Sequence, residues 1–391
     1  KLPVITLDKS TPRDAVCKVF ENVNTGGVAL TVFELVTAMF ASHIDPRTNA
    51  GFDLREDWQQ CCDLIRGVSE PLRTDVLNGL DESAFLTAIT LYTTYRGGKM
   101  TTCKRSDVLS LPYERYLENK PALLEGFRLA RKFLIQQYVF RQNDLPYTTQ
   151  LVPLAAVCAV IGESLFNKPQ TQRILTRWFW CGILGEMYGS ANETRYANDI
   201  EDVVGEINGR ETPNRTVNAA FFSATRLLSL QTRNSAAYKG IMALIYREGC
   251  RDFIKGTTMN LVTSMDGSPD IHHIFPEAHC VAKGYVRDQW NCIVNKTPLL
   301  PESNRAIRGD APSLYSKRIL DVAQIDDAQL RARVESHLID YDAMIRDDFD
   351  GFFIARAKRL LTIIEDAMGK PVADRGAEQT IRAFGESLAE R

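Results

Sequence analysis

A helical repeat of apolar residues runs from Asp53 to Cys250 and constrains the fold more than any other feature of this chain. Within it, apolar side chains recur every three or four residues, which places them on one face of a helix. One such series is Leu123, Phe127, Ala130, Leu134 and Tyr138. Signals for strands fall only near the two ends of the chain. The sequence therefore predicts a mainly α protein: a helical body with a partial α/β segment before it and a small ββα unit after it.

The stretch from Thr171 to Tyr188 is apolar almost all round, which is typical of a helix buried in the centre of a protein. Its aromatic residues Trp178, Phe179 and Trp180 could also form a platform on which nucleic-acid bases stack. We favour the core interpretation, because these three rings occur within a series that is apolar on every side.

The chain has 391 residues, which is enough for two or three domains with substantial cores. The pattern predicts an N-terminal segment at 1–50, a helical middle domain at 51–250 and a C-terminal domain at 251–391. Apolar residues make up 45% and charged residues 25%, as in ordinary soluble globular proteins. The net charge is −2, so any surface that binds nucleic acid must be local.

The nine cysteines include no C-x-x-C pair and lie mostly among apolar residues. This pattern indicates reduced, buried thiols in a cytoplasmic protein. A zinc site formed by His279, Cys280 and Cys292 is a less favoured alternative. The longest apolar run, Leu151 to Ile161, is interrupted by Pro153 and is too short to span a bilayer. We therefore expect no membrane segment and no signal peptide.

A tight loop formed by Asn24, Thr25, Gly26 and Gly27 comes shortly before a predicted helix. The two glycines are free to adopt positive φ angles. The run Thr31–Glu34 has the spacing of a capping box, so the loop leads into a well-defined helix N-terminus. Such a terminus can hold a phosphate, which makes the four loop residues nucleotide-binding candidates. A plain turn before a capped helix explains the same residues equally well.

Two adjacent histidines, His272 and His273, stand between apolar residues in the stretch Asp270 to Pro276. Neighbours on a strand point to opposite faces, so one ring could bind a metal ion while the other accepts a proton from water. Asn295 and Asn304 follow downstream. A strand with His-His, a second strand with Asn and a short helix with a third ligand would form a ββα-metal unit. The alternative is that the histidines cap a strand end and the asparagines serve turns.

These residues carry a resemblance to a known family. The runs H-H-I-F-P, N-C-I-V-N-K-T-P-L-L and S-N-R-A-I-R-G-D-A-P-S-L-Y resemble the C-terminal His-Asn-His (HNH-like) nuclease domain of the GmrSD-type restriction endonucleases. The run from Phe20 to Leu35, F-E-N-V-N-T-G-G-V-A-L-T-V-F-E-L, is similar to the signature of the ParB-like N-terminal domain of that family. The resemblance implies an endonuclease that cuts double-stranded DNA, often modified phage DNA, in defence against foreign DNA.

The N-terminal part of the resemblance is incomplete. The Asp-Gly-Gln-Gln-Arg motif of the ParB-like domain is absent from this sequence, and the chain starts at Lys1 within what reads as a strand, Leu2–Leu7. We therefore expect that an N-terminal part is missing here, and that a nucleoside triphosphate binds only when that part is present.

The resemblance also implies a role for each residue of the C-terminal motif. His273 would be the general base, His272 and Asn304 metal ligands, and Asn295 the residue that orients the base or its loop. Asp270 is either a further ligand or a turn cap. A mixed set of nitrogen and oxygen ligands suits Mg²⁺ or Mn²⁺ and could admit Zn²⁺ or Ni²⁺. His272 stands where the family more commonly has an acidic residue, which leaves the metal preference open.

The segment from Lys283 to Arg318 carries seven basic and three acidic residues. This local surplus surrounds Asn295 and Asn304, where a phosphodiester would approach. The candidate DNA contacts are Lys296, Arg305, Arg308, Lys317 and Arg318. A homodimer is left open. Two other classes of function also stay open: a non-catalytic protein that binds DNA or a partner through a retained ββα scaffold, and a nucleotide-sensing regulator.

Overall fold

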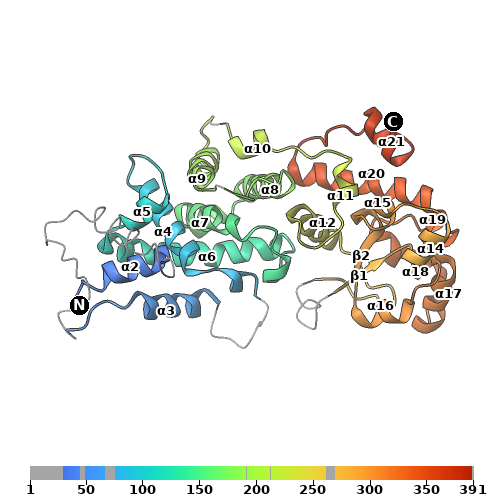
Figure 1. Cartoon of the computed structure of the whole chain (residues 1–391), viewed down its shortest axis with the longest axis horizontal. Helices are drawn as coiled ribbons and strands as arrows, with labels where there is room; N and C mark the ends of the chain where they lie inside the picture. Colours follow the sequence, from blue (N-terminus) through green and yellow to red (C-terminus); the bar gives the residue numbers. More distant parts are fainter. Residues whose placement is uncertain are drawn as a thin grey trace, which may run out of the picture.

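The protein is described by a computed structural model that covers residues 30–44, 49–66, 75–190, 192–211, 213–260 and 269–389. Figure 1 shows a chain built mainly of helices, with one small sheet of two strands. Between residues 80 and 250, the described residues contain no β-strand. The predicted mainly α architecture is therefore confirmed. The predicted strand Leu2–Leu7 and the loop Asn24–Gly27 lie outside the described residues.

The N-terminal half of the helical body occupies the left of Figure 1, and α6 packs along α7 at its centre. Gly126 of α6 permits this packing, because a Cβ atom there would collide with the carbonyl of Ala155 and the side chain of Ala159 in α7. The helices are α2 (Val32–Phe40), α3 (Leu54–Arg66), α4 (Glu82–Arg96), α5 (Arg105–Leu109), α6 (Tyr113–Gln136) and α7 (Leu151–Phe166), with 3-10 turns η1 (Val76–Gly79), η2 (Gln142–Asp144) and η3 (Thr148–Gln150).

The predicted capping box at the start of α2 is confirmed. The Thr31 side chain accepts a hydrogen bond from the backbone N–H of Glu34, and the Glu34 carboxylate accepts one from the backbone N–H of Thr31. These two bonds satisfy donors that the first turn of a helix otherwise leaves unpaired.

The predicted central helix corresponds to α8, and its aromatic rings belong to the core. Trp178, Phe179 and Trp180 are buried. The indole N–H of Trp178 donates to Asp199 at 3.0 Å, and that of Trp180 donates to Gln137 at 2.9 Å. The second half of the helical body consists of α8 (Pro169–Leu184), α9 (Glu193–Ile207), α10 (Arg215–Ala219), α11 (Arg226–Ser229) and α12 (Ala236–Arg247).

The C-terminal part lies at the right of Figure 1 and contains the sheet, an antiparallel pair of β1 (Asp270–His273) and β2 (Lys296–Leu299). Helix α16 packs against β1. The remaining elements are α14 (Glu277–Ala282), α15 (Arg287–Trp290), η4 (Ile293–Asn295), α16 (Pro301–Ile307), α17 (Pro312–Ala323), α18 (Asp327–Glu335), α19 (Tyr341–Ile345), α20 (Phe349–Met368) and α21 (Glu378–Phe384).

Helix α20 joins the sheet region to the helical body. It packs against α8 and α12 of the body and against η4. Its fully buried Arg356 donates hydrogen bonds to the carbonyls of Val294 at 2.5 Å and Lys296 at 2.8 Å. Burial lowers the pKa of Arg356 to about 9. This arginine fixes the start of β2 without a carboxylate partner among the described residues.

One helical stretch of the described residues, Thr148–Phe166, is long and apolar enough to cross a membrane, and 61% of it is buried inside the protein. It contains α7, which packs against α4, α6 and α9. The eight cysteines within the described residues are all free and buried, as the sequence predicts. Burial raises the pKa of their thiols, for example to about 12 at Cys103.

Candidate functional site

The β1–β2 hairpin carries both predicted histidines, and its register fixes which residues they oppose. His272 pairs with Thr297 of β2, and His273 pairs with Lys296. Because side chains alternate along a strand, Asp270 and His272 share one face of β1, and Ile271 and His273 share the other. The contacts below agree with this alternation, so the predicted separation of the two rings is what the structure contains.

Three predicted metal ligands come together on the His272 face. The Nδ1 atom of His272 lies 3.0 Å from the Oδ1 atom of Asn304, which α16 contributes. The Nδ2 atom of Asn304 donates to the Asp270 carboxylate at 3.3 Å. Residues that are 34 positions apart in the sequence are thus joined into one polar cluster, which we call the His272 cluster: Asp270, His272 and Asn304.

The His272 ring is almost completely enclosed, with 5% of the residue exposed. Phe253 and Tyr315 meet it edge to face, at centroid distances of 6.4 and 5.7 Å. Burial lowers the pKa of His272 to about 4, so the ring is neutral at physiological pH and has a lone pair to offer. Its Nε2 atom is buried and has no hydrogen-bond partner in the described part of the chain.

The His272 cluster contains nitrogen and oxygen donors of the kinds that small divalent ions bind. Two neighbouring ligands of an octahedral ion with bonds of about 2.1 Å lie about 3.0 Å apart. The distance between His272 Nδ1 and Asn304 Oδ1 is 3.0 Å, and the Asp270 carboxylate adjoins the same amide. Within the described residues, no group of three or more His, Cys, Asp or Glu side chains is arranged to hold a metal ion. The cluster is of a different composition, since one of its three members is an amide.

Asp252 positions the helix that carries Asn304, and the sequence analysis did not identify it. This fully buried carboxylate accepts hydrogen bonds from the Ser303 hydroxyl at 2.5 Å and from the Leu300 backbone N–H at 2.9 Å. It also accepts the backbone N–H groups of Ile254 and Lys255. Its local bonds are those of an ordinary turn aspartate, so nothing in the sequence indicates the long-range bonds to the start of α16.

His337 supports β2 through Thr297. The ring of His337 is fully buried. Its Nε2–H donates to the Arg251 carbonyl at 2.7 Å, so its Nδ1 accepts the hydroxyl of Thr297 at 2.6 Å. Burial lowers the pKa of His337 to about 3. Thr297 pairs with His272 across the two strands and shares its face of the sheet, so His337 braces β2 on the same face as the cluster.

The surroundings of His273 differ from those of His272. The ring is partly exposed, and its Nε2 lies 3.2 Å from the amide oxygen of Asn291. Trp290 meets it edge to face at 6.0 Å. Burial and the nearby Lys296 lower the pKa of His273, while Asn291 and Glu277 act in the opposite direction. The ring is therefore neutral at pH 7 and can accept a proton.

Asn295 holds the chain that follows β1. Its Oδ1 accepts the backbone N–H of Phe275 at 2.8 Å, and its Nδ2 donates to the carbonyls of Phe275 and Trp290, each at 2.8 Å. The side chain is fully buried. These bonds fix the segment just after His273 and include none to either histidine ring. Of the two roles expected for Asn295, the geometry is that of a loop-holding residue.

The predicted DNA contacts divide into two groups. Arg305, Arg308 and Lys317 are exposed on α16, its C-terminal end and α17. Arg318 is engaged within the protein, because it donates to the Ile307 carbonyl and pairs with Asp310. Three of the five candidates therefore present their charge to solvent.

Lys296 requires a correction. It is buried, with 6% exposed, and its Nζ donates to the Gln231 carbonyl at 2.6 Å. A local count of basic residues in the sequence contains no information on which of them fold inward. Lys296 thus binds the loop between α11 and α12 and does not face a phosphate at the surface.

The two thiols of the alternative zinc site are occupied by other contacts. The thiols of Cys280 and Cys292 donate to the carbonyls of Phe275 and Gln289, at 3.6 and 3.2 Å. The ring of His279 packs against Phe275. These three side chains are not among any metal-holding group of the described residues.

No known protein-family model matches this chain. Its sequence is 24% identical over 339 residues to an uncharacterized protein from Methanocaldococcus jannaschii, and the match covers 82% of this chain and 53% of that protein. The chain therefore spans about half the length of the curated relative it matches. The function has to be argued from the geometry of the site.

Proposed function

We propose that this chain is a metal-dependent DNA endonuclease that hydrolyses phosphodiester bonds, with β1, β2 and α16 as an HNH-like ββα-metal unit. The observation that carries the proposal is the convergence of Asp270, His272 and Asn304 beside a neutral, partly exposed His273. A role in restriction of foreign or modified phage DNA is part of the proposal through the sequence resemblance.

The His272 cluster would hold the ion through His272 Nδ1, Asn304 Oδ1 and the Asp270 carboxylate. Nδ1 carries the ring proton in its hydrogen bond to Asn304, so binding of the ion would require that proton to move to Nε2. A bound Mg²⁺ or Mn²⁺ would supply charge that stabilises the phosphorane-like transition state and the departing 3′ oxygen. The neutral state of His272 supports this role, because a protonated imidazole cannot be a ligand. Asp252 and His337 hold α16 and β2, so that Asn304 and His272 keep their relative positions.

His273 would act as the general base. Its Nε2–H donates to Asn291, which leaves Nδ1 as the nitrogen that accepts a proton. In this step a water oxygen forms a bond to phosphorus, its proton passes to His273, and the bond between phosphorus and the 3′ oxygen breaks. Asn291 is a positioning residue for the ring, and Asn295 holds the backbone beyond it.

Substrate contacts are proposed for the exposed cations near α16. Arg305, Arg308 and Lys317 are available for phosphate oxygens, since they are exposed and adjoin the element that carries Asn304. Such contacts fix the position of a duplex and carry no sequence information. The net charge of −2 means that this local surface would have to supply most of the electrostatic attraction.

A non-catalytic protein that retains the hairpin as a scaffold is the second candidate. The observation that favours it is that both histidine rings already have a protein partner, Asn304 for His272 and Asn291 for His273. The unpaired Nε2 of His272 favours the nuclease instead, because that nitrogen is free to take the ring proton when Nδ1 binds an ion.

Plasmid nicking tests the proposal. Supercoiled DNA is incubated with Mg²⁺, with Mn²⁺ and with EDTA, using wild type, His273→Ala and His43→Ala. His43 is a matched control, because its ring stacks on Tyr113 in the helical body. We expect metal-dependent nicking by wild type and His43→Ala only. Equal nicking by His273→Ala, from preparations free of contaminating nuclease, would favour the scaffold.

A further inference from the structure

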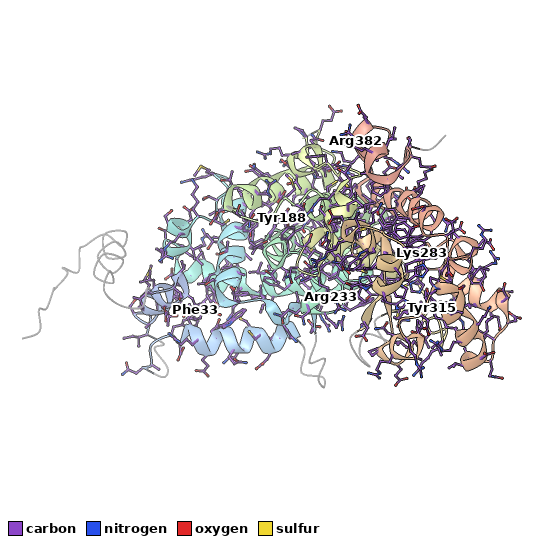
Figure 2. All side chains as sticks on the ribbon, turned by 45° about the vertical axis from the view of Figure 1, so that its right-hand side comes forward. Phe33, Tyr188, Arg233, Lys283, Tyr315 and Arg382 are labelled. Atoms are coloured by element: carbon purple, nitrogen blue, oxygen red, sulfur yellow. The ribbon has the colours of Figure 1, made fainter. Side chains whose placement is uncertain are left out.

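A small cavity lies where the helical body meets the other face of β1. Its walls come from the segment after α6, from α12 and the loop before it, and from β1, and include Tyr138, Arg233, Tyr238, Lys239 and Ile271. Its volume is about 50 Å³, which suits a few water molecules or one group of similar size, and is too small for a nucleobase. Figure 2 labels Arg233 at this junction, away from Tyr315 beside the His272 cluster.

The cations of this cavity outnumber the acidic groups. Arg141 and Asp144 both line it, but they form a close ion pair with each other. Lys239 is partly buried, and its Nζ donates to the Leu145 carbonyl at 3.1 Å. Arg233 is exposed at the rim. Among the described residues, neither Lys239 nor Arg233 has a carboxylate within ion-pairing distance, and an ammonium group has three protons to donate.

Two further cations lie close behind the aromatic wall. The Nζ of Lys296 is 6.0 Å from the centroid of the Tyr238 ring, and burial lowers the pKa of both Lys296 and Lys239. Arg356 also acts electrostatically on Tyr238. Desolvated cations without counter-ions are costly, and a bound anion would remove much of that cost. Tyr238 and Lys239 also belong to the first turn of α12, whose dipole favours a negative charge.

We propose that this cavity is a binding site for a phosphate group, held by Arg233 and Lys239 on the body side of the hairpin. Ile271 belongs to the same face of β1 as His273, so a phosphate bound here adjoins the proposed base and not the His272 cluster. The group could belong to a nucleic-acid strand or to a free phosphate compound. Phosphate binding at this site requires neither a metal ion nor cleavage, so it can be tested independently of the proposed nuclease activity.

Two binding measurements in EDTA test the site, with Arg233→Gln and Arg233→Gln/Lys239→Gln as variants. The control is Lys358→Gln/Arg382→Gln, which removes two positive charges that pair with Glu386 and Glu378. The first measurement compares thermal unfolding in sodium phosphate and in sodium chloride of equal ionic strength. The second follows the anisotropy of a fluorescein-labelled DNA duplex over a range of salt concentrations.

If a free phosphate compound is the occupant, phosphate raises the Tm of wild type and of the control, and not that of the double variant. If a strand phosphate is the occupant, the slope of log K against log salt falls by about 0.9 in the double variant and is unchanged in the control. Arg233→Gln alone should show part of either effect, and it avoids any change in the half-buried lysine. The inference is wrong if both variants match wild type in the rise of Tm with phosphate and in the salt dependence of DNA binding. If wild type binds phosphate at this site but does not nick DNA, only the proposed nuclease function is wrong.

Discussion

The two faces of the β1–β2 hairpin give two adjacent histidines different environments. On one face His272 is enclosed by Phe253 and Tyr315 and joined to Asn304. On the other face His273 is partly exposed and bonded to Asn291, close to the helical body. Adjacent residues of one strand thus have a closed and an open environment. The difference teaches that strand alternation, together with the elements that pack on each face, can give two neighbouring residues of the same type separate environments.

The largest expected effect concerns the open face. His273→Ala should lower the nicking rate by about 10² to 10⁴, because general-base catalysis is typically worth that factor. Metal affinity should stay close to wild type, since the variant leaves the closed face unchanged. Nicking time courses and Mn²⁺ titration of the same preparation provide the two readouts. A variant that loses both properties would mean that the two faces form one site.

The second prediction concerns the residue that holds the segment after β1. Asn295→Ala leaves the backbone of Phe275 and the carbonyl of Trp290 without their buried partner. Each buried group left unpaired costs about 1–3 kcal/mol, so the free energy of unfolding should fall by several kcal/mol. Nicking should slow, and metal binding should persist at temperatures where the variant is folded. Urea unfolding measures the change, with Asn291→Ala as the control; there we expect a smaller loss, because Asn291 is partly exposed.

The third prediction uses pH to examine the closed face. Burial lowers the pKa of His337 to about 3 in the folded protein, whereas an unfolded histidine titrates near 6.5. The unfolded state therefore binds more protons between these values, so stability is complete above about pH 6.5 and is lost as the pH falls toward 3. The slope from one such group is at most about 1.4 kcal/mol per pH unit. Urea unfolding at several pH values should show a shallower slope in His337→Gln than in wild type.

The smallest expected effect concerns the exposed cations near the closed face. Arg305→Gln should weaken DNA binding and lower the slope of log K against log salt by about 0.9, if it contacts one phosphate. Arg318→Gln should change the slope less, because Arg318 already pairs with Asp310, and should instead loosen the end of α16. Anisotropy titrations in EDTA give both slopes. Equal slopes in wild type and Arg305→Gln would place the DNA elsewhere.

The sequence predicts the elements of this fold better than their contacts. Helical periodicity, the Thr31 capping box and the burial of Trp178 and Trp180 are local or compositional, and the structure confirms them. The set of Asp270, His272 and Asn304 was chosen from the motif, and the structure brings its members together.

Residues that support the site from distant positions in the sequence could not be predicted in the same way. Asp252 reaches Ser303 across 51 residues, and Arg356 reaches Val294 across 62, through packing that no local pattern encodes. The local surplus of basic residues predicts a surface charge at Lys296, whereas its side chain folds inward onto Gln231. A charge count gives the number of cations in a segment but not their exposure.

The central claim is that the closed face alone binds the divalent ion, and Mn²⁺ titration followed by calorimetry tests it most directly. We expect one tight Mn²⁺-binding site in wild type and in His273→Ala. We expect an affinity lower by roughly tenfold or more in His272→Ala and Asn304→Ala, since even residues that only support a ligand typically contribute 10–100-fold. Unchanged Mn²⁺ affinity in both His272→Ala and Asn304→Ala, with the proteins folded, would contradict the account.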